Sequence, residues 1–361
     1  MTKTKIRYIT KVSHIDELNQ KDKERLKEVE QKYIFRSNEY YNSLIDWNNP
    51  DDPLRRLVIP SIDELEEWGE LDASKEHKYT VAKGLEHKYL DTALIIFNDM
   101  CGAYCRYCFR KRLFIKGNDD TIRDLKEAIE YIKEHSEIQN ILITGGDPLI
   151  VSTSKIEPLV RKLREIEHVG VIRIGSKMLS FNPYRVIDDE KLINMIKKYS
   201  TPKKRIYIMS HFSHPNEITP EAIKAVDLLL KAGAIINNQT PIIKRINDSV
   251  DILAQLFIKL VSIGVSPYYI FGCRPTAGNK DYSVEVERAY DIFNQARCKV
   301  AGVASRAKFV MSHESGKVEV LGVDSENIYF RYHRAAKQEE CGKIFKFKRN
   351  KNALWLDDYL T

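Results

Sequence analysis

The sequence predicts an α/β protein whose centre is a parallel β-sheet. From about residue 90, short β-rich apolar runs alternate with amphipathic helical segments, and unusual polar residues and cysteines follow directly after those runs. Strands that alternate with helices are typical of a parallel sheet, either open or closed into a barrel. The chemistry of such sheets lies at the carboxyl ends of the strands. We therefore look for the functional site in the loops that follow the predicted strands.

The composition is that of an ordinary globular protein. The 361 residues are 43% hydrophobic and 30% charged, which suits one large domain with appendages or two ordinary domains. No apolar run reaches the roughly 20 residues of a membrane-spanning helix. The first thirty residues lack the apolar core of a secretory signal. We expect a cytoplasmic protein that has no membrane partner.

Residues 1–86 predict a helical extension. Residues 15–33 are highly charged with sparse apolar positions, and Ser61 with Glu64 forms a capping box that opens a short helix. This segment shows none of the strand and helix alternation that follows it. We expect it to be an appendage of the main domain.

Residues 87–300 predict the sheet and its helices. The helical segment at residues 121–133 carries its apolar side chains on one stripe, as expected for a helix that packs on a sheet. Six βα units in series predict the parallel order. The predicted strands are residues 93–97, 140–144, 169–174, 205–209, 234–238 and 268–271.

Residues 301–361 predict a small C-terminal lobe. Strands are expected over residues 310–323 around a turn at residues 313–316. The basic segment at residues 343–351 (KIFKFKRNK) interleaves aromatics, a pattern that nucleic-acid-binding proteins also use. The simpler interpretation is an amphipathic strand with a solvated Lys/Arg face. The net charge of +7 is spread along the chain, so we expect no nucleic-acid partner.

Three of the six cysteines fall within eight residues, at Cys101, Cys105 and Cys108. In a cytosolic chain, this spacing favours metal ligation over disulfides. A structural zinc site needs four ligands, and no fourth cysteine or histidine lies at a suitable spacing. Three thiolates on a [4Fe–4S] cluster leave one iron open for a small molecule. The alternatives are packing cysteines or a zinc site completed from a distant segment.

The residues around these cysteines resemble the lysine 2,3-aminomutase family, a branch of the radical S-adenosylmethionine superfamily. Residues 101–112 (CGAYCRYCFRKR) carry the Cys-x3-Cys-x2-Cys signature. Further matches follow in order, as GGDPL, RIGS, HFSHPNEIT, NQ, ND and PYYI. The resemblance implies a partial (βα)6 TIM-like radical SAM barrel at residues 87–300, with the N-terminal extension and the C-terminal lobe attached to it.

The resemblance also implies the chemistry. The cluster would bind S-adenosylmethionine, and an electron from a flavodoxin- or ferredoxin-type donor would release a 5′-deoxyadenosyl radical. Pyridoxal phosphate (PLP) beside the cluster would carry the migrating amino group. The expected enzyme is an isomerase that converts an α-amino acid into a β-amino acid.

Several residues match the family's cofactor positions. Lys317 matches the lysine that links to PLP, although only Gly316 and Lys317 remain of the family's glycine run. Lys88 and Thr92 stand where the family carries two phosphate-binding arginines, and a lysine lacks the bidentate fork of an arginine. The remaining residues implied for the cofactors are Tyr89, Gly145, Gly146, Asp147, His211 and Gln239.

The substrate positions depart from those of lysine enzymes. Arg110 matches the arginine that clamps the substrate α-carboxylate. Arg274 and Val310 stand where two aspartates bind the distal ammonium of lysine, so one negative charge is lost and the other is replaced by a positive one. A buried arginine repels an ammonium and suits a carboxylate. We therefore expect an acidic, glutamate-like substrate.

Three alternatives remain open at this stage. The first is an enzyme that acts on lysine itself. The second is an enzyme of the same family that works without PLP and is linked to the modification of a translation factor. The third is a protein whose cysteines hold only structural zinc. The family's C-terminal zinc-binding cysteines have no counterpart here, and a homo-oligomer through another surface remains open.

Overall fold

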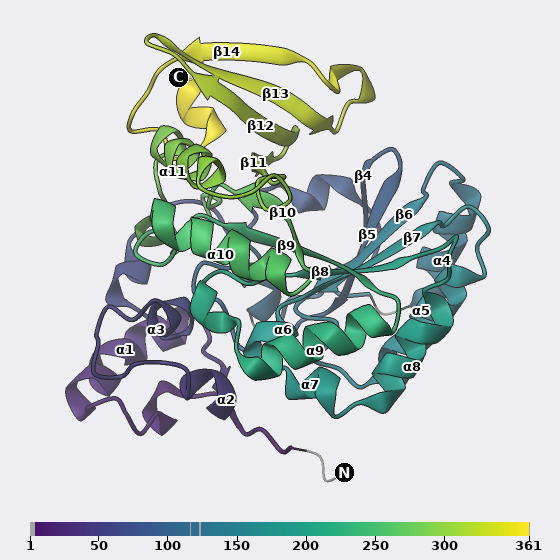
Figure 1. Ribbon diagram of the computed structural model, residues 1–361, viewed down its shortest axis with the longest axis horizontal. Helices are drawn as coiled ribbons and strands as arrows, with labels where there is room; N and C mark the ends of the chain where they lie inside the picture. The colour runs from purple at the N-terminus through teal and green to yellow at the C-terminus, as the bar shows by residue number, and fades with distance from the viewer. Residues whose placement is uncertain (1–3, 116, 123, 361) are drawn as a thin grey trace.

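A twelve-stranded sheet forms the centre of this computed structural model, which describes residues 4–115, 117–122 and 124–360 (Figure 1). The strands follow one another in a linear order from β14 to β3, so in the described residues the sheet is an open, partial barrel as expected. Its central strands are all parallel: β5 (Thr92–Asn98), β6 (Asn140–Gly145), β7 (Val171–Ser176), β8 (Ile206–Ser210), β9 (Ile235–Pro241), β10 (Ser266–Phe271) and β11 (Lys308–His313).

The six predicted strands correspond to β5 through β10. Most begin with β-branched or other apolar residues that a sheet covered by helices can bury, and β9 continues into the polar residues Asn237, Asn238 and Gln239. Within β6, for example, Ile141 and Ile143 are fully buried. The seventh parallel strand, β11, was expected in the C-terminal lobe, but it pairs with β10 and belongs to the central sheet.

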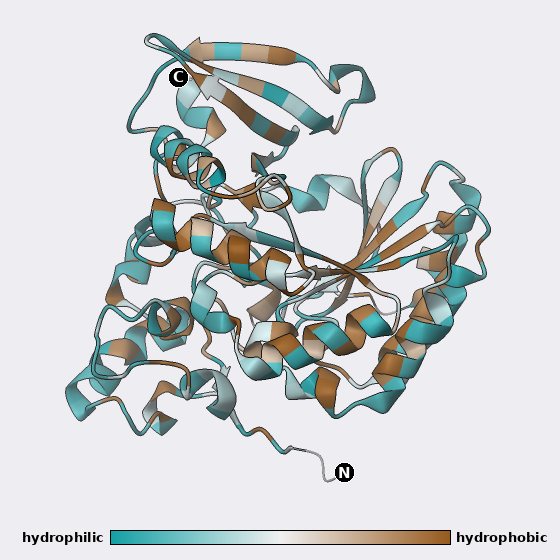
Figure 2. Cartoon of the chain, viewed as in Figure 1, coloured by the Kyte–Doolittle hydropathy of each residue, from teal (hydrophilic) through white to brown (hydrophobic). Residues whose placement is uncertain are grey.

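The connecting helices lie along the outside of the central strands (Figure 1). Their hydrophobic residues gather on one side (Figure 2), and acidic or hydroxyl side chains cap several of them, including Asp124, Asp189 and Thr219. The helices are α4 (Leu125–Glu134), α5 (Thr153–Arg164), α6 (Met178–Phe181), α7 (Tyr184–Ile187), α8 (Glu190–Tyr199), α9 (Pro220–Lys231), α10 (Val250–Ser262) and α11 (Val286–Cys298).

The N-terminal residues form a separate packed layer. The short strands β1 (Tyr8–Ile9) and β2 (Ser37–Asn38) pair with each other, and the predicted capping box of Ser61 and Glu64 is present. The helices of this layer are α1 (Gln20–Lys32), α2 (Glu39–Asn42) and α3 (Pro53–Val58). Their apolar cluster also contains Ala103 and Tyr107 of the cysteine loop, so this layer supports that loop directly.

Antiparallel strands extend both edges of the sheet. At one edge, β3 (Thr80–Ala82) and β4 (Leu85–Tyr89) pair with each other, and β4 pairs with β5. At the other edge, β12 (Gly316–Val323), β13 (Asn327–Ala335) and β14 (Ile344–Lys348) follow β11.

The last strand matches the amphipathic interpretation of the basic segment. Phe345 and Phe347 of β14 pack on the core, whereas Lys346 and Lys348 are exposed. None of the described helices is long and apolar enough to cross a membrane.

Candidate active site

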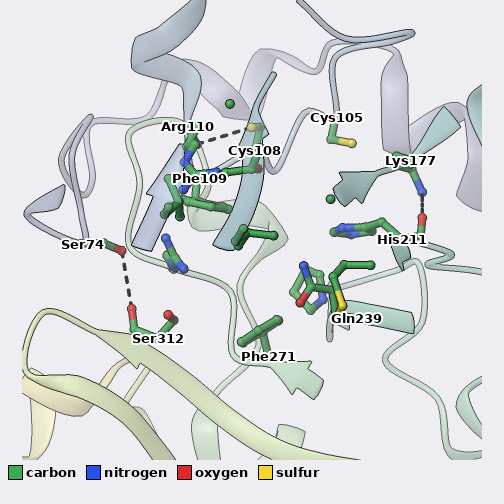
Figure 3. Close-up of a pocket in the computed structure, with 18 of the residues that line it drawn as sticks. Ser74, Cys105, Cys108, Phe109, Arg110, Lys177, His211, Gln239, Phe271 and Ser312 are labelled. Carbon is green, nitrogen blue, oxygen red and sulfur yellow. Dashed lines mark hydrogen bonds between the residues drawn. The ribbon is translucent and has the colours of Figure 1, made fainter. Parts of the chain in front are cut away.

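A cavity of about 310 Å³ opens where the parallel strands end. Side chains from the cysteine loop, from the ends of β6 to β10 and from β11 and β12 line it, and Figure 3 shows the cysteine loop facing Phe271 and Ser312 across the cavity. Every residue that the sequence analysis placed in the site lies on this wall: Lys88, Tyr89, Cys101, Cys105, Cys108, Arg110, Gly145, Gly146, Asp147, His211, Gln239, Arg274 and Lys317.

The three cysteines occupy a loop that directly follows β5. Backbone N–H groups of the loop donate to the N-terminal layer, from Tyr104 to the Arg36 carbonyl at 2.9 Å and from Arg106 to the Leu57 carbonyl at 2.9 Å. Burial raises the pKa of all three thiols, and a coordinating metal would reverse that effect by binding the thiolates. Among the described residues, no three Cys, His, Asp or Glu side chains converge as ligands of a single metal ion would. Three thiolates on one loop are a donor set that suits a polynuclear cluster, in which each thiolate binds its own iron.

A buried ion pair fixes the loop from behind. Arg106 is 2% exposed and Glu64 is fully buried. The guanidinium Nε and Nη2 donate to the two carboxylate oxygens at 2.9 and 2.8 Å, and Nη1 donates to the Ile34 carbonyl at 3.0 Å. Because Arg106 immediately follows Cys105, this bidentate pair fixes the backbone of the cysteine loop.

The Gly145-Gly146-Asp147 turn lies against the backbone in front of the cysteine loop. The Gly146 N–H donates to the Asn98 carbonyl and the Asp147 N–H to the Met100 carbonyl, each at 2.6 Å. A Cβ on Gly146 would lie 2.2 Å from the Met100 carbonyl oxygen, so only glycine permits this approach.

The Asp147 carboxylate holds the turn. It accepts from the Lys177 N–H at 2.7 Å, the Leu149 N–H at 2.9 Å and the Ser176 hydroxyl at 3.1 Å. Burial nevertheless raises its pKa to about 6.

A hydrogen-bonded network lies behind the cluster loop. The Tyr107 hydroxyl is 3.0 Å from both His211 Nε2 and the Ser213 hydroxyl. Lys177 Nζ donates to the His211 carbonyl at 2.7 Å (Figure 3). It also pairs with buried Glu217 at 2.6 Å. Burial, and then the charge of Lys177, hold the pKa of His211 well below its usual value, so its imidazole is neutral.

Lys317 lies at the opposite end of the cavity. It occupies β12, where it pairs with Ser312 of β11 and Arg334 of β13. Its ammonium stands over the rings of Tyr269 and Phe271, 5.1 and 5.0 Å from their centroids. Burial and the neighbouring cations depress the pKa of Lys317 well below its ordinary value. A neutral amine is the form that attacks a carbonyl.

Arg110 is buried but already holds a carboxylate. Its Nε and Nη2 donate to the two oxygens of Glu76 at 3.2 and 2.9 Å, and its Nη1 donates to the Thr144 hydroxyl at 3.0 Å. Arg112 binds the same Glu76 carboxylate at 2.7 Å. These two arginines hold the pKa of Glu76 below its usual range. The fork of Arg110, which the resemblance assigns to the substrate α-carboxylate, is thus filled by Glu76 in this structure.

Arg274 is half-buried, and one nitrogen of its guanidinium is buried without a hydrogen-bond partner in the described residues. It stacks on Phe109 of the cysteine loop, with Cζ 3.6 Å from the ring centroid. The buried nitrogen is Nη1. Burial lowers the pKa of Arg274 to about 10, which leaves it charged at neutral pH. A buried cationic nitrogen without a hydrogen-bond partner on a cavity wall is a place for an anion.

The sequence analysis missed several charged residues of the cavity wall. Glu76, Glu86, Arg173 and Arg334 all line it. Glu86 is buried, and its Oε1 accepts no hydrogen bond from the described residues but lies 3.9 Å from Arg112 Nη2. Burial raises the pKa of Glu86 to about 8. Only Arg173 stood within a motif that resembled the family, and the others carry no local signal.

Comparisons with known proteins place these observations in context. The family model of the Radical SAM superfamily matches residues 95–257. A protein of Aquifex aeolicus (strain VF5) provisionally named L-lysine 2,3-aminomutase is 53% identical over 98% of this chain and 95% of its own. The L-lysine 2,3-aminomutase of Clostridium subterminale is 38% identical over 73% of this chain and 62% of its own. The glutamate 2,3-aminomutase of Clostridioides difficile (strain 630) is 34% identical over 84% of this chain and 71% of its own.

Proposed function

The chain belongs to the lysine 2,3-aminomutase family of radical S-adenosylmethionine enzymes, and from this premise we propose that it is a PLP-dependent 2,3-aminomutase of an acidic α-amino acid. It is an isomerase that uses a [4Fe–4S] cluster and S-adenosylmethionine. When bound, these two supply a 5′-deoxyadenosyl radical that removes an unactivated hydrogen atom. The substrate and the PLP requirement are the parts that we propose.

In this proposal, residues at one end of the cavity hold the cluster, and residues at the other end bind PLP. Cys101, Cys105 and Cys108 would hold the cluster, and the Gly145-Gly146-Asp147 turn lies beside it because its backbone bonds directly to the segment before Cys101. At the far end, Lys317 provides a buried amine with aromatic walls. Such an amine can bind PLP covalently, and PLP would carry the amino group that migrates.

The observation that carries the acidic substrate is the guanidinium of Arg274, whose buried Nη1 has no hydrogen-bond partner among the described residues. Buried donors without partners cost free energy, and a substrate carboxylate would satisfy them with charge-assisted hydrogen bonds. A lysine ammonium at that place would add a second buried positive charge. Arg110 would release Glu76 and bind the α-carboxylate of the substrate in its place.

A second candidate is a basic substrate such as lysine. The buried Oε1 of Glu86 favours it, because this oxygen accepts no hydrogen bond from the described residues and could receive an ammonium in addition to its 3.9 Å ion pair with Arg112. The chain is also 53% identical to a relative provisionally named for lysine. Against it stands the raised pKa of Glu86, about 8, which keeps the carboxyl largely neutral at pH 7.

The decisive experiment is turnover of the reconstituted enzyme with L-glutamate and with L-lysine, under a chemical reductant that replaces the protein electron donor. We expect β-glutamate from the wild type and no β-lysine. Arg274→Gln should lower kcat/KM for glutamate by about 100-fold, because it removes a buried charge-assisted pair. Turnover of lysine without turnover of glutamate would show that the acidic assignment is wrong.

A further inference from the structure

Arg334 comes from the far end of the chain but reaches the edge of the sheet beside Thr92. It lies on β13, directly across from Lys317, so the two side chains project from the same face. Its Nη1 is 3.4 Å from the Thr92 hydroxyl, and its Nη2 pairs with Asp91. The guanidinium also stacks on Tyr89, with Cζ 4.8 Å from the ring centroid. A guanidinium from the C-terminal strands thus stands beside Thr92, where the sequence lacks an arginine.

Two further cations face the same part of the cavity. Arg173 of β7 donates from Nε to the Asn140 side chain at 2.8 Å, which fixes its orientation. Lys88 of β4 donates to the His313 carbonyl at 2.7 Å, within the turn that carries the chain towards Lys317. Both line the cavity together with Arg334. After burial, the charges of Arg274, Arg173, Lys88 and Arg334 are the influences that lower the pKa of Lys317.

We infer that Arg334, with Arg173 and Lys88, anchors the phosphate of PLP, while the Lys317 amine condenses with the aldehyde carbon and the aldehyde oxygen leaves as water. A phosphate carries a charge of about −1.5 to −2 at pH 7 and three acceptor oxygens, which suits a site lined by two guanidinium groups and an ammonium. This inference rests on the PLP dependence proposed above and names the residues that would supply it. Asp91 orients Arg334 through Nη2, and Nη1, which donates one N–H to the Thr92 hydroxyl, keeps a second N–H for the ligand.

The test compares PLP with pyridoxal, which has the same aldehyde but no phosphate. The full-length, cluster-reconstituted protein is incubated with increasing concentrations of either compound. Borohydride then fixes the bound fraction, and mass spectrometry of the Lys317 peptide measures it. In Arg334→Gln, the apparent affinity for PLP should fall tenfold or more, about the effect of one lost charge-assisted hydrogen bond. Affinity for pyridoxal should stay unchanged, and Arg334→Lys should restore part of the PLP affinity.

Arg331→Gln is the matched control. Arg331 lies on the same strand and pairs with Glu319 at 2.6 Å, as Arg334 pairs with Asp91, but it lies outside the cavity wall. It should bind both compounds as the wild type does. If Arg334→Gln loses PLP and pyridoxal equally, or keeps full PLP affinity, the phosphate assignment is wrong. A wild type that takes up neither compound overturns both this assignment and the proposed PLP dependence.

Discussion

At the scale of single residues, the two arginines that the sequence predicts to bind the substrate differ in the hydrogen-bond partners of their guanidinium groups. Arg274 has a buried Nη1 that finds no hydrogen-bond partner in the part of the chain that the structure describes, whereas the fork of Arg110 is filled by Glu76. Glu76 is a carboxylate in the place where the substrate's carboxylate is expected. Because Arg112 also binds Glu76, that side chain can leave Arg110 without losing its charge partner.

This arrangement predicts competition between Glu76 and the substrate. Glu76→Gln should lower KM for the amino acid by about tenfold with little change in kcat, because the substrate no longer displaces a charged group. Steady-state kinetics at a fixed S-adenosylmethionine concentration measures the effect. Glu70→Gln is the control, since Glu70 pairs with Lys75 in the same segment but is exposed and lies outside the cavity. A raised KM in Glu76→Gln would mean that Glu76 supports the clamp and does not compete with the substrate.

Some residues of the candidate site could be predicted from the sequence and others could not. The difference lies in whether a residue stands in a local sequence motif or depends on a partner far away in the chain. The cysteines, Gly145 and Gly146, and Lys317 were found because each stands in a local pattern. Glu76 and Arg334 could not be found, because their partners Arg110 and Thr92 lie 34 and 242 residues away in the chain. Nothing near either residue in the sequence signals such a contact.

At the scale of elements, the N-terminal layer is the support of the cysteine loop. Apolar side chains of this layer form one cluster with Tyr107, and Arg106 pairs with Glu64 in complete burial. The sequence predicted the helices and the capping box, because these are local features. It did not predict where they pack, because the contact with the loop depends on Arg106 finding Glu64 across 42 residues. The parallel pairing of β11 with β10 was missed for the same reason.

Breaking the pair should loosen the loop. Glu64→Gln leaves the Arg106 charge buried without a partner, and we expect a loss of about 3–5 kcal/mol of stability. The iron content after reconstitution should fall with it, because the loop that carries the cysteines is no longer fixed. The control is Glu66→Gln, two residues after Glu64 in the chain. It removes an exposed ion pair with Lys280 and should lower the free energy of unfolding by about 0–1 kcal/mol. Thermal unfolding and iron analysis check both variants, and equal losses in the two would contradict the role of Glu64.

At the scale of the whole molecule, the sheet joins two chemical halves. The cysteine loop follows β5, while Lys317 and Arg334 come from β12 and β13, near the opposite edge of the same sheet. The cavity between them exists because the strands curve far enough for both groups to face one space. A radical enzyme needs this arrangement, since the hydrogen donor and the migrating group must lie in reach of each other.

A substitution that adds one methyl group should remove PLP binding without affecting the iron–sulfur cluster. Gly316 has a φ of +152°, and a Cβ there would lie 2.3 Å from the Arg334 carbonyl oxygen, so Gly316→Ala should push β12 away from β13. We expect this variant to keep its iron and to cleave S-adenosylmethionine, but to lose the PLP bound through Lys317. Gly322→Ala is the control, because it adds the same methyl group to the same strand with nothing within 4 Å of the new Cβ. Iron analysis, deoxyadenosine release and borohydride fixation of PLP measure the three functions. If Gly316→Ala retains PLP as Gly322→Ala does, the close contact of β12 with β13 does not position Lys317. If it loses iron as well, the two halves fold as one unit and cannot be separated.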